Sequence, residues 1–398
     1  MRRTLIITII VLALLGIGAA VYFYIFASSG VIVTPPLGGG LPIAGESAQI
    51  PEGAGVANAP SGAPVSVSAR LVKISAGPVV PGEAVVNIKA ANASSSPEVA
   101  VSYIERQSGN VFSYKVGAAT LTRISNKTFP GIQTAAWLPD ASLAFVRFLS
   151  GADFSTINTY ALPANGANGF FLSQNLADLA VASTSVLTLA SGVNGSVASL
   201  SRTDGTRAST VFTMPLSAAR VSFAGKNQYL AFTKPSAEVP GSAFLVDSTG
   251  RFSRISGPRS GLVALASPLG KWVLVSSILD GAMRMELVNT STNETIALPV
   301  ATIADKCVWA ADDSTIYCGV PLNPPFDVNY PDDWYQGAVS FTDRLWKIQV
   351  AGRYAQLVLD FSEETKGSLD AEALAVDPAG TVLVFVNKND GSLWSYRL

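Results

Sequence analysis

Residues 134–148 read TAAWLPDASLAFVRF, which is an apolar strand, a turn at Pro139–Ser142 and a second apolar strand. A third strand is expected near Asn158–Leu162. The pattern recurs, and the first turns of successive units stand 46, 44, 42, 43, 43 and 67 residues apart. These turns lie at Ser94, Asp140, Thr184, Lys226, Leu269, Asp312 and Ala379. Because units of roughly 40–45 residues with about four strands are typical of propeller blades, the sequence predicts an all-β, seven-bladed β-propeller.

Pairs of apolar strands mark the other units. They include Leu179–Val181 with Val186–Leu189, Val221–Phe223 with Tyr229–Phe232, and Leu262–Leu265 with Trp272–Val275 and Met283–Val288. Strands that are covered on both faces read as nearly continuous apolar runs, as stacked blades require.

The two ends of the repeat region predict how the ring closes. The last unit offers strands at Ala373–Val376, Thr381–Val386 and Ser392–Leu398, and then the chain stops. The segment Ala69–Ser75 resembles the fourth strand of the next unit, Leu121–Ser125. We therefore expect this N-terminal strand to complete the C-terminal blade, which removes exposed sheet edges.

Two stretches carry a resemblance to a known family. Leu138–Phe145 and Asp377–Phe385 look like the Pro-Asp-Gly turn and following strand of WD40-like (TolB-type) β-propeller repeat proteins. The resemblance implies the fold and an exported setting, but no chemistry. The chain departs from the family because it lacks a Trp-Asp dipeptide, any histidine and a TolB-like N-terminal α/β domain.

The N-terminus predicts a membrane anchor. Thr4–Phe26 is free of charge and about 34 Å long as a helix, which is enough to cross a bilayer. Arg2 and Arg3 precede it, so the positive-inside rule places the N-terminus in the cytoplasm and the repeats outside, in the periplasm or extracellular space. The alternative is a signal peptide cleaved near the small residues 27–29.

The predicted organisation has three parts. Residues 1–29 form the cytoplasmic tip and single transmembrane anchor, residues 30–66 form a linker rich in Pro, Gly, Ala and Ser, and residues 67–398 form the propeller.

The 27 basic and 28 acidic residues nearly balance. Because nucleic-acid binders usually carry a basic excess, no nucleic-acid partner is expected.

The chain has two cysteines, Cys307 and Cys318. Counting outward from a hairpin turn at Asp312–Asp313 places them opposite each other on adjacent strands. An exported setting permits a disulfide here, which would contribute roughly 2–3 kcal/mol. The alternative is a pair of reduced, half-buried thiols.

The absence of histidine restricts the possible chemistry. Ser-His-Asp and Cys-His mechanisms are excluded, and two cysteines without histidine fall short of a zinc ligand set. We therefore expect no catalytic residue, no metal site and no cofactor. Because Asp and Glu alone can cleave glycosidic bonds, a carboxylate-based hydrolase of envelope glycans or peptides remains the alternative.

The insertion at about 319–344 departs most from the repeat and should project from one face. Aromatic and acidic residues there could bind a sugar or peptide, or fold back as a lid. The candidate binding residues are Phe326, Asp327, Tyr330, Asp332, Asp333, Trp334 and Tyr335. The sequence thus predicts a non-enzymatic binding or scaffolding module of the cytoplasmic membrane, anchored through residues 4–26, for an unidentified envelope protein or glycan.

Overall fold

A computed structural model describes residues 64–88 and 98–398. The predicted anchor Thr4–Phe26, most of the predicted linker and Ser94 lie outside these residues. Within the described part, no helix is long and apolar enough to cross a membrane. Regular structure already begins at Val65, inside the segment predicted as linker.

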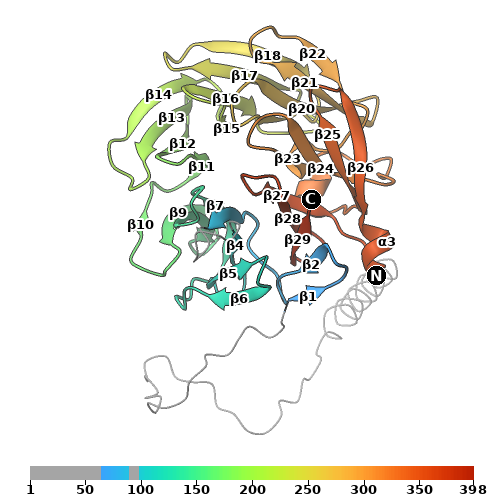
Figure 1. Cartoon of the computed structure of the whole chain (residues 1–398). Helices are drawn as coiled ribbons and strands as arrows, with labels where there is room; N and C mark the ends of the chain where they lie inside the picture. Colours follow the sequence, from blue (N-terminus) through green and yellow to red (C-terminus); the bar gives the residue numbers. More distant parts are fainter. Residues whose placement is uncertain (1–63, 89–97) are drawn as a thin grey trace, which may run out of the picture. The chain divides into compact units, whose positions relative to one another are not determined.

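The described strands form seven antiparallel sheets arranged around a central axis, which confirms the predicted seven-bladed propeller (Figure 1). Blades 1 to 3 each contain four strands in chain order. Blade 1 contains β3 (Ala84–Ile88), β4 (Glu98–Ile104), β5 (Val111–Lys115) and β6 (Thr120–Arg123). Blade 2 contains β7 (Ile132–Trp137), β8 (Leu143–Ser150), β9 (Thr156–Pro163) and β10 (Phe170–Phe171). Blade 3 contains β11 (Leu176–Val181), β12 (Ser185–Gly192), β13 (Gly195–Arg202) and β14 (Ser209–Met214).

Blades 4 to 6 repeat this order, and blade 6 also carries short helices. Blade 4 contains β15 (Ala219–Phe223), β16 (Gln228–Thr233), β17 (Gly241–Asp247) and β18 (Phe252–Arg259). Blade 5 contains β19 (Val263–Ala266), β20 (Trp272–Leu279), β21 (Ala282–Asn289) and β22 (Thr295–Ala297). Blade 6 contains η1 (Ala304–Lys306), β23 (Cys307–Trp309), β24 (Thr315–Pro321), α2 (Asp332–Gln336), β25 (Asp343–Gln349), β26 (Tyr354–Asp360) and α3 (Phe361–Thr365).

Blade 7 is built from both ends of the repeat region. Its strands are β27 (Ala371–Val376), β28 (Val382–Asn387), β29 (Leu393–Arg397), β2 (Leu71–Lys73) and β1 (Val65–Ser66). Val72 pairs with Ser395, and the Ile74 amide donates to the Leu393 carbonyl at 2.8 Å. The predicted closure by the N-terminal strand is therefore confirmed.

Burial explains why the middle strands read as apolar runs. Every residue of β28 is buried, because this sheet packs against a neighbouring blade on each side. One apolar cluster joins Val85 and Val101 of blade 1 to Val382 and Val384 of blade 7. The outer strands are more exposed, so the core consists of layers between adjacent blades.

Acidic side chains organise the turns between first and second strands. The Asp140 carboxylate accepts from the amide of Ser142 at 3.0 Å, which fixes the turn predicted there. Asp313 is buried and accepts from Ser267 Oγ at 2.7 Å and from the Leu269 amide at 2.9 Å. This carboxylate therefore joins the turn of blade 6 to the turn of blade 5.

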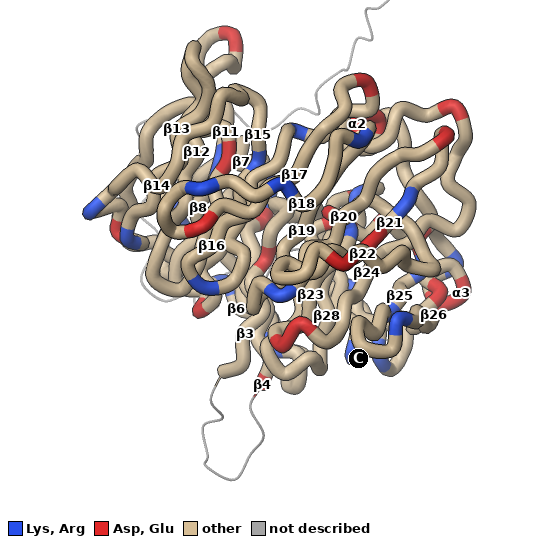
Figure 2. Tube along the Cα trace, turned by 90° about the horizontal axis from the view of Figure 1, so that it is seen from above, with Lys and Arg blue, Asp and Glu red and all other residues tan. Residues whose placement is uncertain are grey.

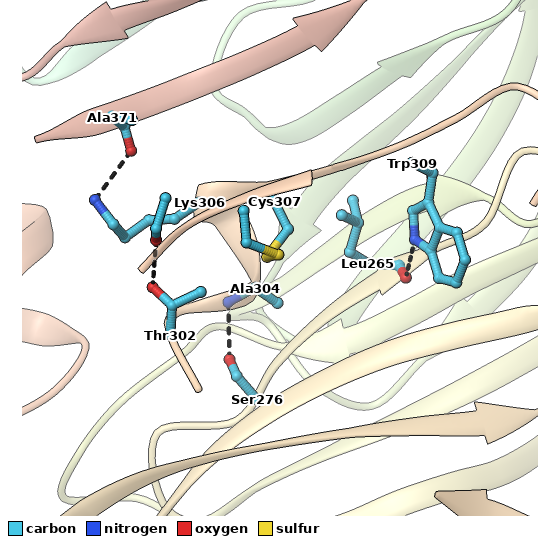
Figure 3. Close-up of a disulfide and its surroundings, with 10 residues drawn as sticks. Leu265, Ser276, Thr302, Ala304, Lys306, Cys307, Trp309 and Ala371 are labelled. Carbon is cyan, nitrogen blue, oxygen red and sulfur yellow. Dashed lines mark hydrogen bonds between the residues drawn. A yellow bond between two sulfur atoms is a disulfide. The ribbon is translucent and has the colours of Figure 1, made fainter. Parts of the chain in front are cut away.

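The disulfide between Cys307 and Cys318 is present, and its predicted register is confirmed. It joins the first and second strands of blade 6, where Trp309 also faces Ile316. The bond lies next to Lys306, whose side chain extends toward Ala371 and away from the sulfur atoms (Figure 3).

Each blade turns back between its second and third strands at the same end of the propeller. Every blade is an antiparallel meander whose first strand is innermost. Because the innermost strands of a propeller all run in the same direction along the axis, the turn between the second and third strands falls at the same end in every blade. We call this end the hairpin face. Its connections in blades 2 to 6 are residues 151–155, 193–194, 234–240, 280–281 and 322–342. Figure 2 shows this face at the top, with α2 on it.

Candidate functional site

The insertion of blade 6 folds partly back onto the propeller. Residues 322–342 connect β24 to β25 and include α2. Tyr330 and Trp334 are buried, whereas Phe326 is 91% exposed. Asp332 accepts from the Ala237 amide, so it holds the insertion to blade 4. The predicted binding residues therefore separate into an anchored group and an exposed tip.

The remaining predicted residues divide in the same way. Asp333 accepts from the Asn329 amide at 2.8 Å and stabilises the start of α2. The Tyr335 hydroxyl donates to Asp305 at 2.7 Å, although the side chain is partly exposed. Asp327 is exposed beside Phe326.

A buried ion cluster lies beneath the anchored part of the insertion. Lys306 Nζ contacts Asp343 Oδ2 at 2.8 Å and also pairs with Asp370, and all three side chains are fully buried. Trp334 Nε1 donates to Asp370 Oδ2 at 3.0 Å. The Trp334 ring lies 4.9 Å from Lys306 Nζ, and the Phe341 ring lies 5.1 Å away.

The cluster contains one carboxyl group with a strongly perturbed pKa. Burial raises the pKa of Asp343 to about 6; Lys306 opposes this rise and the negative charge of Asp370 adds to it. Asp343 Oδ1 has no hydrogen-bond partner among the described residues, which is consistent with this shift. Since the whole cluster is enclosed, it holds the insertion, blade 6 and blade 7 together and is closed to a substrate.

The sequence did not identify this cluster. Lys306, Asp343 and Asp370 lie in three separate elements, and no spacing joins them. One local signal was available, because Lys306 is a charged residue directly before the apolar strand that begins at Cys307. A lysine at the start of an innermost strand needs buried partners.

A second ionic contact joins blade 4 to blade 6, past the intervening blade 5. Arg220, in the innermost strand of blade 4, contacts Asp305 Oδ2 at 2.6 Å. The same carboxylate accepts the hydrogen bond from Tyr335. Together with the Asp332 contact, these bonds hold the insertion between blades 4 and 6 at the hairpin face.

A cavity of about 600 Å³ lies beside these contacts, between the innermost strands of blades 2, 3 and 4. Its charged lining residues are Arg147, Asp178, Arg220 and Lys234. Arg147 donates to the Leu176 carbonyl, and Asp178 accepts from the Val221 amide at 2.8 Å. Lys234 is exposed and forms no ion pair within the described residues. The cavity is therefore open, and Lys234 is the lining cation whose charge is unpaired within the described residues.

Glu83 is a buried acid whose two carboxylate oxygens have no hydrogen-bond partner among the described residues. Burial raises the pKa of Glu83 well above its usual value, and the negative charge of Glu372 adds to the rise. Burial also raises the pKa of Glu372, against the opposing charge of Lys388. In residues 64–88 and 98–398, no group of three or more acidic or cysteine side chains could hold a metal ion.

The β-propeller fold is the feature that this chain shares with solved structures. No protein-family model and no curated protein sequence matches it. The β-propeller domain of the Trilobed protease from Pyrococcus furiosus, described as having an open velcro topology, is similar with a TM-score of 0.50 and 8% identity over 80% of this chain and 93% of that chain. An oligogalacturonate lyase in complex with manganese gives a TM-score of 0.49 and 10% identity, over 81% and 98%.

A third structure, an oligogalacturonate lyase from Vibrio parahaemolyticus, gives a TM-score of 0.36 and 10% identity over 75% of this chain and 74% of that one. At such identities the similarity shows the fold alone. In this chain β2 pairs with β29 and closes the ring.

Proposed function

We propose that this chain is a non-enzymatic binding propeller, held by its N-terminal segment at the outer side of a cytoplasmic membrane, that binds a glycan or protein of the cell envelope. The observation that carries the proposal is the open cavity lined by Arg147, Arg220 and Lys234. Arg220 is paired with Asp305 and Arg147 donates to the Leu176 carbonyl, whereas the Lys234 ammonium group forms no ion pair within the described residues. An unpaired cation in a cavity favours a ligand that carries a carboxylate or another anionic group.

The position of the other acids supports binding over hydrolysis. Asp343 and Asp370 are enclosed with Lys306, and Asp305 is engaged by Arg220 and Tyr335. A glycosidase needs two carboxyl groups on either side of an accessible bond. The cavity has only Asp178 in its lining, so it offers recognition without such a pair.

The binding test uses the full-length chain and a peptidoglycan disaccharide–tripeptide that carries free carboxylates. Isothermal titration calorimetry should detect binding of this fragment and at least tenfold weaker binding of its amidated form. Lys234→Ala should weaken binding at least tenfold, because it removes an exposed cation from the cavity. Lys226→Ala is the matched control, since Lys226 is exposed in the turn at the opposite end of blade 4. Equal binding of both fragments would reject the anionic ligand.

Topology needs a separate test. External protease added to spheroplasts should digest the propeller if the positive charges of Arg2 and Arg3 keep the N-terminus inside. Protection of the propeller in intact spheroplasts, with digestion only after lysis, would overturn the proposed location.

A hydrolase is the second candidate, because two acids with raised pKa values lie close to each other's charge: Glu372 on the innermost strand of blade 7 and Glu83 directly before the innermost strand of blade 1. Incubation with peptidoglycan and measurement of new reducing ends tests it directly. Release of reducing ends by the wild type and its loss in Glu83→Gln would favour the hydrolase, whereas no release would favour the binding module.

A further inference from the structure

The hairpin face presents an exposed apolar side chain on each of five successive blades. The side chains are Phe154, Val193, Val239, Leu279 and Phe326, in blades 2 to 6. Phe154 is 66% exposed and Val193 fully exposed. Single exposed apolar residues are ordinary on a protein surface, but their recurrence at the same end of five successive blades, where the second strand leads into the third, indicates an interaction surface.

The backbone at Phe154 makes this residue harder to explain by folding alone. Its φ is 55°, in the left-handed region, where a bulky side chain is unfavourable. In blades 5 and 6 the corresponding turns place Asp280 and Asp327 in this region, and aspartate tolerates it better. Phe154 gains little burial in exchange, so a contact outside the propeller accounts best for its presence.

Four of the five apolar tips have an acidic neighbour in the sequence. The pairs are Asp153–Phe154, Glu238–Val239, Leu279–Asp280 and Phe326–Asp327, and all four acids are exposed. Within these connections of blades 2 to 6, Lys234 is the only basic residue, whereas the corresponding connections of blades 1 and 7 carry Arg106 and Lys388. Figure 2 shows acidic positions at the tips of several projecting loops. The tips therefore combine apolar contact area with negative charge.

We infer that the hairpin face docks a protein whose contact surface combines apolar residues with Lys and Arg. This inference rests on the proposed binding function and names the surface and partner class, using residues other than the anionic-ligand cavity. Apolar side chains in pockets of the partner would supply binding energy. The adjacent carboxylates would steer association and fix the orientation by pairing with basic groups.

Charge argues against three other occupants. An anionic membrane surface would repel the acidic tips. The chain's own N-terminal segment is unsuited, because residues 27–69 contain neither Lys nor Arg. A second copy docked through the same face would bring like charges together, which opposes association.

The test measures fluorescence anisotropy of two peptides with the full-length chain in zwitterionic nanodiscs. Both peptides are of equal length and carry leucines on one helical face; one has lysines and the other glutamates at the remaining positions. We expect the lysine peptide to bind at least tenfold more tightly. Combined Phe154→Ser, Val193→Ser and Phe326→Ser changes should weaken its binding at least tenfold. Combined Asp153→Asn, Glu238→Gln, Asp280→Asn and Asp327→Asn changes should reduce the salt dependence of binding.

Leu269→Ser provides the matched control, because Leu269 is an exposed apolar residue in the turn at the opposite end of blade 5. Unchanged binding in this control and unchanged melting temperatures in all variants would support the inference. Equal binding of the two peptides, or an equal loss in Leu269→Ser, would overturn it. Tip-dependent co-sedimentation with phosphatidylglycerol vesicles would also overturn it, in favour of a membrane. If fragment binding by the cavity persists while peptide discrimination is absent, only this inference fails.

Discussion

Lys306 is the charged residue around which the interior of blades 6 and 7 is arranged. Its fully buried ammonium group contacts Asp343 and Asp370 and donates to the Ala371 carbonyl at 2.9 Å. Trp334 packs over it. Breaking such a buried pair by removing one partner typically costs about 3–5 kcal/mol, because the other charge stays buried. The cluster is therefore a structural centre that orders the insertion.

Asp343 should make stability depend on pH. Burial raises the pKa of this carboxyl to about 6 in the folded protein, against about 3.9 in an unfolded chain. A group whose pKa rises on folding binds its proton more tightly in the native state. Its contribution to the free energy of unfolding is therefore fully present below about pH 4 and is lost as the pH rises through 6. This shift corresponds to at most about 3 kcal/mol.

Chemical denaturation of the wild type and Asp343→Asn between pH 4 and 7 measures this contribution. The free energy of unfolding of the wild type should fall relative to that of the variant across this range. Asp280→Asn serves as the control, because Asp280 is an exposed aspartate in the turn between β20 and β21 and its side chain forms no ion pair within the described residues. Parallel curves for the wild type and Asp343→Asn would contradict the prediction.

At the level of the element, the insertion of blade 6 has two parts with different roles. The segment around α2 is bonded to blade 4 through Asp332 and to blade 7 through Trp334 and Asp370. The preceding tip, with Phe326 and Asp327, is exposed. The lid and the binding loop considered from the sequence can thus occupy different segments of one insertion.

Two alanine substitutions should separate these parts. Trp334→Ala removes a buried aromatic side chain and a hydrogen bond to Asp370, so we expect a loss of about 3–5 kcal/mol in the free energy of unfolding. Phe326→Ala changes an exposed side chain and should alter stability by less than about 0.5 kcal/mol. Urea denaturation checks both, and equal losses would contradict the division of the insertion.

At the scale of the whole molecule, the ring is closed by strands from opposite ends of the repeat region. β2 fills the position beside β29, and the Arg70 guanidinium lies 4.7 Å from the Tyr396 ring. Without β2, the backbone groups of β29 would form an exposed sheet edge that could pair with another chain. The disulfide does not close the ring, because both cysteines belong to blade 6.

Proline substitution tests the closure. The Ile74 amide donates to β29, and amides two residues apart on a strand point the same way, so the Val72 amide also faces β29, at Ser395. Val72→Pro removes this amide and should lower the free energy of unfolding by about 3 kcal/mol or more. Ser66→Pro is the control. The Val67 amide donates to the Leu71 carbonyl, and successive amides of a strand point to opposite sides, so the Ser66 amide points away from β2. We expect urea denaturation and size-exclusion chromatography to show destabilisation and association only for Val72→Pro. The same behaviour in both variants would contradict a specific role for this strand pair.

The sequence by itself determined the number of blades, the strand pairs, the closing strand and the facing cysteines. These features follow from local patterns: apolar strands with a regular period, and hairpin turns that set the register of their neighbours. The position of the insertion was visible as well, because it lengthened one interval between turns.

Tertiary structure alone decided the ion cluster, the cavity and the division of the insertion into anchored and exposed parts. Lys306, Asp343 and Asp370 meet only because blades 6 and 7 stack in a ring, and Arg220 reaches Asp305 only because blades 4 and 6 belong to the same ring. A repeat pattern specifies each sheet from its own residues. Contacts between sheets depend on side chains far apart in the chain, whose partners are set by the packing of the closed ring.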